Sequence, residues 1–572
     1  MNPCVKIITN FFAWCTLIFR NGKHSFYQMA EGNNINDNDK IKTSVRLQDT
    51  DTEGRPSIYL FIFVNPLSGA RKGSDLIHLP IQHFRLRRLP QIQVEIHNYL
   101  DPKDRQAGID RVNLIQNKIK DGDLPPIRSS SDTPTTSRAA ERKHTDAAET
   151  MPEATGRISE GVQTRHIHVW SGGGDGTVMS IFEMLVENHV DLDLVFLSCI
   201  PFGTGNDFSQ VLGWGRTEQG GVIGDNLESL EQLISDRFEY SEPARLDIWQ
   251  AEMTSYDGGQ VRLASEPKTT KRTRYVAKMC NYMSIGVQGY VGSGFEKHRS
   301  KKRWLNIGVY TIESSKWAFW RKFPTLNNFI DSIRAQDGQQ MLLEVPSTFV
   351  TPTRVNPGSS SNGEDHQQQN HPKLATPAID LIIQNIPHLW GQELDIWGEA
   401  KEGLETVSNR SGPTDPDLWT PQLANDGKLE VIAMENMMSY LKKLANFRDH
   451  VARVGQFPGP FEIHFREPPE TATGAQPHEN TGCLHMWQRR RRNKYERKNV
   501  LGVMVDGEFY RIRHPQRVRF ERIAQVVTLG RSDQQKQGRL VRDEKKRQDG
   551  QMYQTGATEA TEATGAIASS SS

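Results

Sequence analysis

A run of glycines that contains one acid is the segment whose chemistry can be deduced most directly. Ser171–Thr177 reads Ser-Gly-Gly-Gly-Asp-Gly-Thr, and successive glycines let the backbone approach a ligand closely and turn its N–H groups toward an anion. Apolar residues at helical spacing follow at 178–186, so a helix begins at this loop. A helix N-terminus favours phosphate, and an ordinary tight turn would not need Asp175 within the run. The pattern indicates a phosphate-binding loop.

Two further loops follow apolar runs of strand length. Ile58–Val64 leads into Asn65–Gly69, which reads Asn-Pro-Leu-Ser-Gly, and Leu192–Ile200 leads into Pro201–Asp207, which reads Pro-Phe-Gly-Thr-Gly-Asn-Asp. Runs without polar alternation are typical of strands buried on both faces, as in a parallel sheet. Because ligands bind at the carboxyl ends of such strands, we expect all three loops to meet at one edge.

The elements that must position these loops are strand–loop–helix units, which predict a doubly wound α/β fold. Beyond Pro243 the runs become shorter and are separated by turn signals, which predicts a mainly β, sandwich-like second domain with one helix at Met437–Val451. Polar segments rich in Pro, Ser and Thr are interpreted as disordered insertions. The predicted division is a disordered leader at 1–57; an α/β domain at 58–243 with an insertion at 122–164; a β-rich domain at 244–530 with insertions at 351–373 and 467–499; and a disordered tail at 531–572.

Composition narrows the class of protein. The chain has 572 residues, and its 70 Lys and Arg against 69 Asp and Glu give a net charge of +1, so no whole-chain field points to nucleic acid. The five cysteines form no Cys-x-x-Cys pair, which argues against a disulfide scaffold or zinc finger and favours a reducing cytosol. The apolar run Val5–Phe19 is shorter than the roughly 20 residues of a membrane helix. We interpret it as part of the leader, with an anchor or signal peptide as the alternative.

The three loops together resemble the nucleotide site of the diacylglycerol kinase family, whose motifs are Asn-Pro-x-Ser-Gly, Gly-Gly-Asp-Gly-Thr and Pro-x-Gly-Thr-Gly-Asn-Asp. Further likenesses follow in order: Leu-Gly-Trp-Gly at Leu212–Gly215, Leu246–Trp249, Asn-Tyr-Met-Ser-Ile-Gly-Val at Asn281–Val287, and Val-Asp-Gly-Glu at Val505–Glu508. The resemblance covers about residues 58–520. It implies a catalytic α/β domain followed by an accessory domain.

By that resemblance the chain would be an ATP-dependent lipid kinase that phosphorylates diacylglycerol to phosphatidic acid in lipid signalling. The alternatives are a sphingoid-base or ceramide kinase, or an inactive regulator that binds nucleotide or lipid. Mg²⁺ should bridge the ATP phosphates, with Asp175 near the metal and acting in catalysis. The residues implied in ATP binding are Asn65, Pro66, Ser68, Gly69, Gly173, Gly174, Asp175, Gly176, Thr177, Gly203, Thr204, Gly205, Asn206 and Asp207.

Glu508 resembles the family's general base, placed to take a proton from the primary hydroxyl of the lipid. The alternative is a solvated hairpin turn, because Asp-Gly between strand residues is a common hairpin signal. One departure concerns Gln288, which stands where the family has an aspartate in a metal-and-water network. The main nucleotide loops remain whole beside this neutral amide, which favours altered affinity over loss of activity.

Contact with an anionic membrane could come from the basic cluster, defined as Arg489–Lys498, which lies beside Trp487. A nuclear-localisation signal and a solvated loop remain equally open interpretations of this cluster. A second basic stretch, Lys297–Arg303, could face the same surface. We expect a cytoplasmic protein that associates peripherally with membranes and does not bind nucleic acid. His166 and His168 share a strand face, and they are interpreted as structural rather than as metal ligands.

Overall fold

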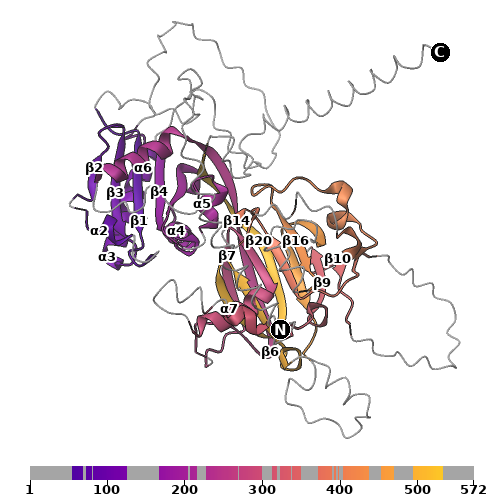
Figure 1. The fold of residues 1–572 in the computed structure, drawn as a ribbon. Helices are drawn as coiled ribbons and strands as arrows, with labels where there is room; N and C mark the ends of the chain where they lie inside the picture. Colours follow the sequence, from indigo (N-terminus) through magenta and orange to yellow (C-terminus); the bar gives the residue numbers. More distant parts are fainter. Residues whose placement is uncertain are drawn as a thin grey trace, which may run out of the picture.

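The computed structural model describes most of both predicted domains (Figure 1). The described residues are 54–68, 73–79, 81–124, 166–203, 206–215, 227–267, 269–298, 309, 312–317, 322–335, 338–348, 371–389, 392–393, 397, 403–436, 452–468 and 494–531. The greater part of the predicted leader, insertions and tail lies outside them, as do the predicted helix Met437–Val451 and residues 489–492 of the basic cluster.

The first half is built on parallel strands. β1 (Ile58–Val64) pairs with both β3 (Ile92–Asn98) and β4 (His166–Gly173), and β4 pairs with β5 (Val195–Pro201). β2 (His83–Arg85) runs antiparallel beside β3. All residues of β1 and β5 are buried, as the unbroken apolar runs predict.

Helices cover both faces of this sheet. α3 (Pro102–Lys120) and α4 (Asp175–Glu187) pack on the face that carries Phe61 and Phe63. The opposite face packs against α2 (Ser74–Ile77) and α6 (Leu227–Glu239), while α5 (Asp207–Val211) follows β5. A 3-10 turn, Leu192–Leu194, precedes β5. The predicted doubly wound α/β class is confirmed.

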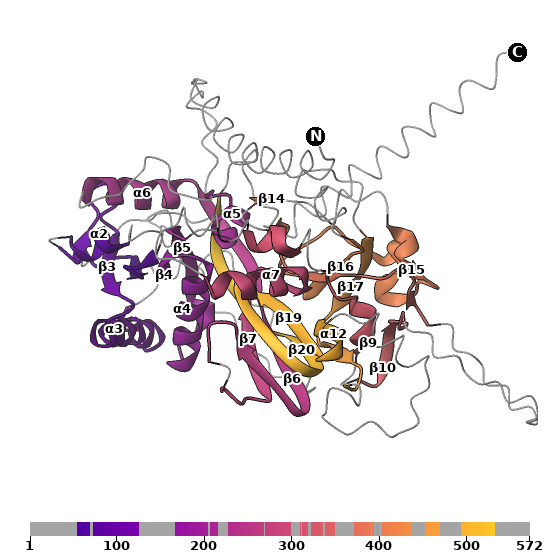
Figure 2. The same cartoon turned by 60° about the horizontal axis from the view of Figure 1, so that its bottom comes forward.

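Two long strands connect the halves. β6 (Ser241–Leu263) and β20 (Glu508–Arg531) form an antiparallel ribbon whose register extends from Tyr510↔Leu263 to Arg531↔Ser241. At one end β20 pairs in parallel with β5 through Val527↔Phe196. The ribbon therefore adds two strands to the first sheet and continues into the second half, as Figures 1 and 2 show. The domain boundary between residues 243 and 244 stays a prediction, because β6 crosses it without a break.

The second half is mainly β, as predicted, and its largest apolar core lies among its strands. The second half includes the helices α7 (Val287–Glu296) and the short α12 (Lys494–Arg497), and 3-10 turns at Leu326–Asn328, Leu404–Thr406, Gly412–Thr414 and Pro416–Leu418. Its further strands are β7 (Arg274–Met279), β8 (Tyr282–Gly286), β9 (Ile330–Ala335), β10 (Gln340–Glu344), β11 (Lys373–Leu374), β12 (Asp380–Gln384), β13 (His388–Leu389), β14 (Gln392–Glu393), β15 (Val407–Ser408), β16 (Lys428–Met434), β17 (Ala452–Pro458), β18 (Phe461–Phe465) and β19 (Val500–Val505). Among the described residues, no helix combines the length and apolar character needed to span a membrane.

Candidate active site

The loops after β1, β4 and β5 meet at the carboxyl edge of the first sheet. The register pairs Val64 with Gly172 and Gly173 with Pro201, so the three strands end at the same level. The N–H of Asn65 donates to the Gly172 carbonyl at 2.9 Å. The N–H groups of Phe202 and Gly203 both donate to the Gly173 carbonyl, at 2.9 and 3.2 Å. Each loop is thus tied by its backbone to the middle strand, β4.

Glycine is required where these loops touch. A Cβ atom on Gly173 would lie 2.4 Å from Thr177 Oγ1, and one on Gly203 would lie 2.4 Å from the Gly174 Cα. A Cβ atom on Gly176, by contrast, would meet nothing within 4 Å. Gly174 caps the N-terminus of α4 with extended backbone, so the first turn of a 13-residue helix opens at the contact between the loops. This arrangement brings backbone N–H groups to an edge with little side-chain cover.

The Asn-Pro loop contributes one side chain to the same edge. Asn65 Nδ2 donates to Thr177 Oγ1 at 3.4 Å, while its Oδ1 accepts from the Leu67 N–H at 3.0 Å. The second bond closes a local turn of the kind that Asn favours. Ser68 donates its N–H to the Asn65 carbonyl, which keeps it in the same turn. Gly69, Thr204 and Gly205 lie outside the described residues.

Asp175 connects two of the loops. Its carboxylate accepts from the N–H groups of Asp207 and Phe208, both at 3.0 Å, and so caps the N-terminus of α5. Asn206, which precedes α5, has a φ of +56°, a value that Asn tolerates well. Burial raises the pKa of Asp175, against the effect of these donors. The structure therefore gives Asp175 a structural task at the site, beside the metal role that the sequence predicts.

A second acid, Asp506, lies beside this group and was not among the residues predicted from the sequence. Its carboxylate accepts from the backbone N–H groups of Cys280, Asn281 and Tyr282, at 2.7, 3.1 and 2.9 Å. The side chain of Asn281 hydrogen-bonds to Asp175, so Asn281 joins the two acids. Burial raises the pKa of Asp506 to about 7, and the charge of Asp175 acts in the same direction.

The signal for Asp506 was present in the Val-Asp-Gly-Glu segment. Asp506 and Gly507 have φ values of +44° and +88°, which makes the Asp-Gly pair the turn between β19 and β20. The positive φ values explain why Asp and Gly occupy this turn. The burial of the Asp506 carboxylate could not be deduced from the motif alone. Through Asn281, this hairpin lies close to the edge of the first sheet at which the three loops end.

Glu508 lies one residue beyond that turn, with an exposed side chain. Its Oε2 accepts from the Tyr510 hydroxyl at 2.7 Å, which orients the carboxylate. Its charge contributes to the raised pKa of Glu183 on α4, after burial and other neighbours. Within the described part of the chain, the Glu508 side chain makes no hydrogen bond or ion pair with the three loops.

Three other residues that stand out in the sequence, Gln288, His166 and His168, contact side chains of the protein itself. Gln288 is buried in the first turn of α7, and its Oε1 accepts from the Tyr282 hydroxyl at 3.1 Å. His168 stacks on Phe196 with ring centroids 4.7 Å apart, and burial lowers the pKa of both His166 and His168. These contacts support the structural interpretation of the histidine pair.

Two family models match the chain: the diacylglycerol kinase catalytic domain over residues 131–237 and the diacylglycerol kinase accessory domain over residues 278–476. The chain belongs to the diacylglycerol kinase family. The accessory-domain match contains Asn281 and Gln288, and the catalytic-domain match contains the loops after β4 and β5. The Asn-Pro loop and the Asp506 hairpin lie outside both matches.

Individual relatives in the diacylglycerol kinase family share only part of their length with this chain. Diacylglycerol kinase 7 of Arabidopsis thaliana is 29% identical over 187 residues, which are 28% of this chain and 37% of the relative. Human diacylglycerol kinase theta is 22% identical over 275 residues, which are 46% of this chain and 22% of the relative. The chain thus spans less than half of either relative. A crystal structure of a diacylglycerol kinase from Bacillus anthracis covers 82% of this chain and 96% of its own, with 13% identity and a TM-score of 0.31.

Proposed function

We propose that this protein is an ATP-dependent lipid kinase that phosphorylates diacylglycerol to phosphatidic acid. The observation that carries the proposal is the contact between Gly174 and Gly203, which brings two loops together with no side chain between them. Such an edge at the start of a 13-residue helix suits a polyphosphate, because it offers N–H donors and a positive dipole end. Family membership supports ATP as the donor and diacylglycerol as the acceptor.

The nucleotide would be held mainly by backbone groups. We assign its phosphates to the loop Gly173–Thr177 and to the loop from Gly203 to Asp207. Asn65 and Ser68 would border them from the third loop. Positioning accounts for most of the catalysis in phosphoryl transfer, so a rigid cradle built from three tied loops is the protein's main contribution.

We propose that an Mg²⁺ ion binds near Asp175. The charges of Asp506, Asp175 and Asp207 all add to the raised pKa of the Cys280 thiol, after its burial, so the three acids lie in the same neighbourhood. Carboxylate oxygens are the ligands that Mg²⁺ prefers, and a cation would relieve the repulsion between Asp175 and Asp506. Bound there, the ion would supply charge neutralisation at the phosphates, with Asp175 holding it directly or through water.

Glu508 is our candidate for the general base. The lipid hydroxyl oxygen would attack the γ-phosphorus, the bond from that phosphorus to the ADP oxygen would break, and the hydroxyl proton would pass to Glu508. The Tyr510 hydroxyl holds the carboxylate at 2.7 Å, while the exposure of Glu508 leaves it open to an acceptor. We further propose that the enzyme acts in the cytoplasm at an anionic membrane surface, with the basic cluster as its contact.

A radiolabelled-ATP assay across diacylglycerol, sphingosine, ceramide and NAD tests the proposal. We expect label in phosphatidic acid, with far lower transfer to the other three acceptors. Label mainly in a sphingolipid would replace the substrate and keep the nucleotide site. Binding of ATP without transfer to any acceptor would favour the regulator, the alternative suggested by Gln288.

A further inference from the structure

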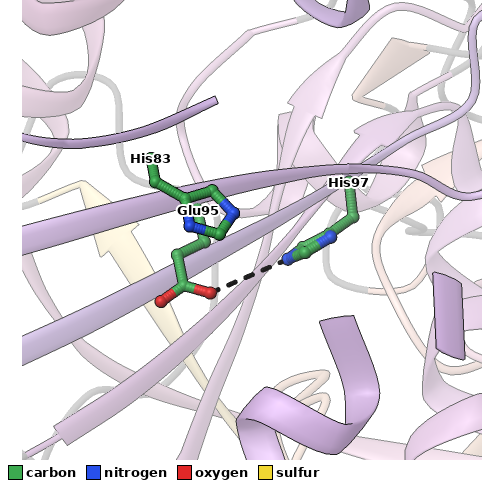
Figure 3. A group of neighbouring side chains, drawn as sticks. All are labelled: His83, Glu95 and His97. Carbon is green, nitrogen blue, oxygen red and sulfur yellow. Dashed lines mark ion pairs between the residues drawn. The ribbon is translucent and has the colours of Figure 1, made fainter. Parts of the chain in front are cut away.

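Two histidines and a glutamate come together at the outer edge of the first sheet, on the face covered by α3. His83 on β2 stands directly opposite Glu95 on β3, and His97 is two residues further along β3. Strand residues two apart point to the same face, so all three side chains share one side of the sheet. One ligand atom from each lies within 4.8 Å of the others, and Figure 3 shows the His97 ring turned toward the Glu95 carboxylate beside His83.

The His97 ring is prepared to act as a ligand through one nitrogen. Its Nδ1 lies 2.9 Å from Asp104 Oδ1, and the other Asp104 oxygen accepts from the Asn98 N–H at 2.6 Å. A proton shared between Nδ1 and the carboxylate leaves the Nε2 lone pair directed outward, as in carboxylate–histidine–metal arrangements. His97 is only 3% exposed, and Nε2 has no hydrogen-bond partner in the part of the chain that the structure describes.

The Glu95 carboxylate is oriented in the same way from its other side. Arg111 contacts it through Nη2 at 2.7 Å and Nε at 3.2 Å, and Gln93 Nε2 donates to Oε1 at 2.9 Å. Oε2 is left 3.9 Å from His97 Nε2, which is too long for a hydrogen bond between them. Oε2 accepts from Arg111 Nε, whereas His97 Nε2 is left without a hydrogen-bond partner among the described residues.

The helix α3 is shaped to hold this arrangement. Asp104 and Arg111 are seven residues apart, two turns along one helix face, with Gly108 between them. A Cβ atom on Gly108 would lie 2.8 Å from two carbons of the His97 ring, so glycine lets the helix lie against the imidazole. Phe63 stacks on the same ring, with centroids 5.5 Å apart.

We propose that His83, Glu95 and His97 bind a divalent transition-metal ion, best matched by Zn²⁺. Two imidazole nitrogens and one carboxylate oxygen suit zinc better than Mg²⁺ or Ca²⁺, which prefer oxygen ligands throughout. In a tetrahedral zinc site the ligand atoms stand roughly 3.3 Å apart, so small rotations from the present spacing close it. His83 is exposed, which leaves water as the fourth ligand. The bound ion links β2 to β3 beneath α3. This metal site does not depend on the proposed kinase function.

The test uses the full chain, free of any affinity tag and stripped of metal with a chelator. Zn²⁺ bound per chain is measured by equilibrium dialysis with metal analysis, and Co²⁺ is added as a spectroscopic substitute. The variant is His83→Ala, because an exposed edge residue can be removed without disturbing the core. The matched control is His78→Ala, which removes another exposed histidine of the same half, whose Nδ1 lies 2.6 Å from the Ser74 carbonyl oxygen.

We expect wild type and His78→Ala to bind one more equivalent of Zn²⁺ than His83→Ala. Added Zn²⁺ should raise their thermal midpoint more than that of His83→Ala, because an ion that binds only the folded state stabilises it. The Co²⁺ absorption of a nitrogen-and-oxygen site should weaken in His83→Ala alone. Equal zinc stoichiometry in the three proteins would overturn the proposal and leave the cluster as an ion-pair network only.

Discussion

Gly174 and Gly203 lie so close that a Cβ atom on Gly203 would stand 2.4 Å from the Gly174 Cα. The two residues follow neighbouring strands, β4 and β5, and the Gly203 N–H also donates to the Gly173 carbonyl. No side chain fits between these loops, so their backbones alone form the surface there. This contact is the basis for the first two predictions.

Gly203→Ala should lower the free energy of unfolding by about 1–3 kcal/mol, because the new methyl group overlaps backbone that must shift. Gly176→Ala, in the first turn of α4, is the matched control, since its Cβ meets nothing within 4 Å. The control should stay within about 0.5 kcal/mol of wild type or be slightly stabilised. Denaturant unfolding measures both, and equal stability of the two variants would contradict the packing described here.

Gly174→Asp should abolish kinase activity and also lower stability somewhat, because its Cβ atom would lie 3.0 Å from the Gly203 Cα. The Asp side chain enters the space assigned to phosphate and adds a negative charge beside it. Calorimetric ATP titration and turnover per folded molecule give the result. Gly258→Asn, at a positive-φ position within β6 with open space around it, is a comparison glycine far along the chain. Normal ATP affinity in Gly174→Asp would remove the nucleotide-loop assignment.

Glu508→Gln should reduce turnover about 10²- to 10⁴-fold, the usual effect of losing a general base, with little change in ATP affinity. The thermal midpoint should stay the same because the side chain is exposed. Tyr510→Phe, which removes only the hydroxyl that orients the carboxylate, should give a smaller loss. If instead the midpoint falls and turnover per folded molecule does not, Glu508 is a hairpin residue and not the base.

The stability of Glu430→Gln relative to wild type should increase with pH. Burial raises the pKa of Glu430 well above its usual value, and the neighbouring charge of Asp426 adds to this. A carboxyl whose folded pKa is raised gives stability that is complete below about pH 4 and is lost as pH rises through the folded pKa. The pKa of Asp426 is itself raised to about 6, chiefly by burial, so Asp426 also loses stability as pH rises toward 6.

The surroundings of Glu430 accept an amide. Gln422 Nε2 donates to Glu430 Oε2 at 2.9 Å, while among the described residues Gln422 Oε1 has no hydrogen-bond partner. If the Gln422 side-chain amide rotates by half a turn, its Oε1 faces residue 430. The N–H of the glutamine introduced at position 430 then donates to Gln422 Oε1. Denaturant unfolding at pH 5 and pH 8 checks the sign, with the same substitution at exposed Glu187 as control. A smaller advantage at pH 8 than at pH 5 would refute the prediction.

Replacing Arg489, Arg490, Arg491 and Arg492 with Ser should weaken binding to anionic vesicles by up to several kcal/mol at low salt. These four residues lie outside the described part of the chain, so the prediction rests on the sequence. Salt near 0.1 M should bring wild type toward the variant, because exposed charges are screened beyond about 10 Å. Turnover on monomeric short-chain diacylglycerol should be unchanged. Equal vesicle binding at low salt would leave a solvated loop or a nuclear signal, and the latter would change the cellular distribution.

The fold class could be predicted because its determinants are local. Unbroken apolar runs such as Ile58–Val64 require burial on both faces, and the glycine loop Ser171–Thr177 marks the turn from strand to helix. The meeting of Asp506 with Asp175 could not be predicted, because it depends on how a late hairpin packs on an early sheet. The same holds for His83 and His97, which are brought together by the pairing of β2 with β3.

The partnership of Val527 with Phe196 has a consequence for how the protein is made. β5 is synthesised long before β20, and at about 5–20 residues per second the delay between them is on the order of tens of seconds. Throughout that time one side of β5 is an unpaired strand edge, the type of surface on which other chains add and aggregate. We therefore expect that chaperones must bind this edge while the chain is still on the ribosome. The yield of folded protein in cells should then depend on the amount of chaperone available.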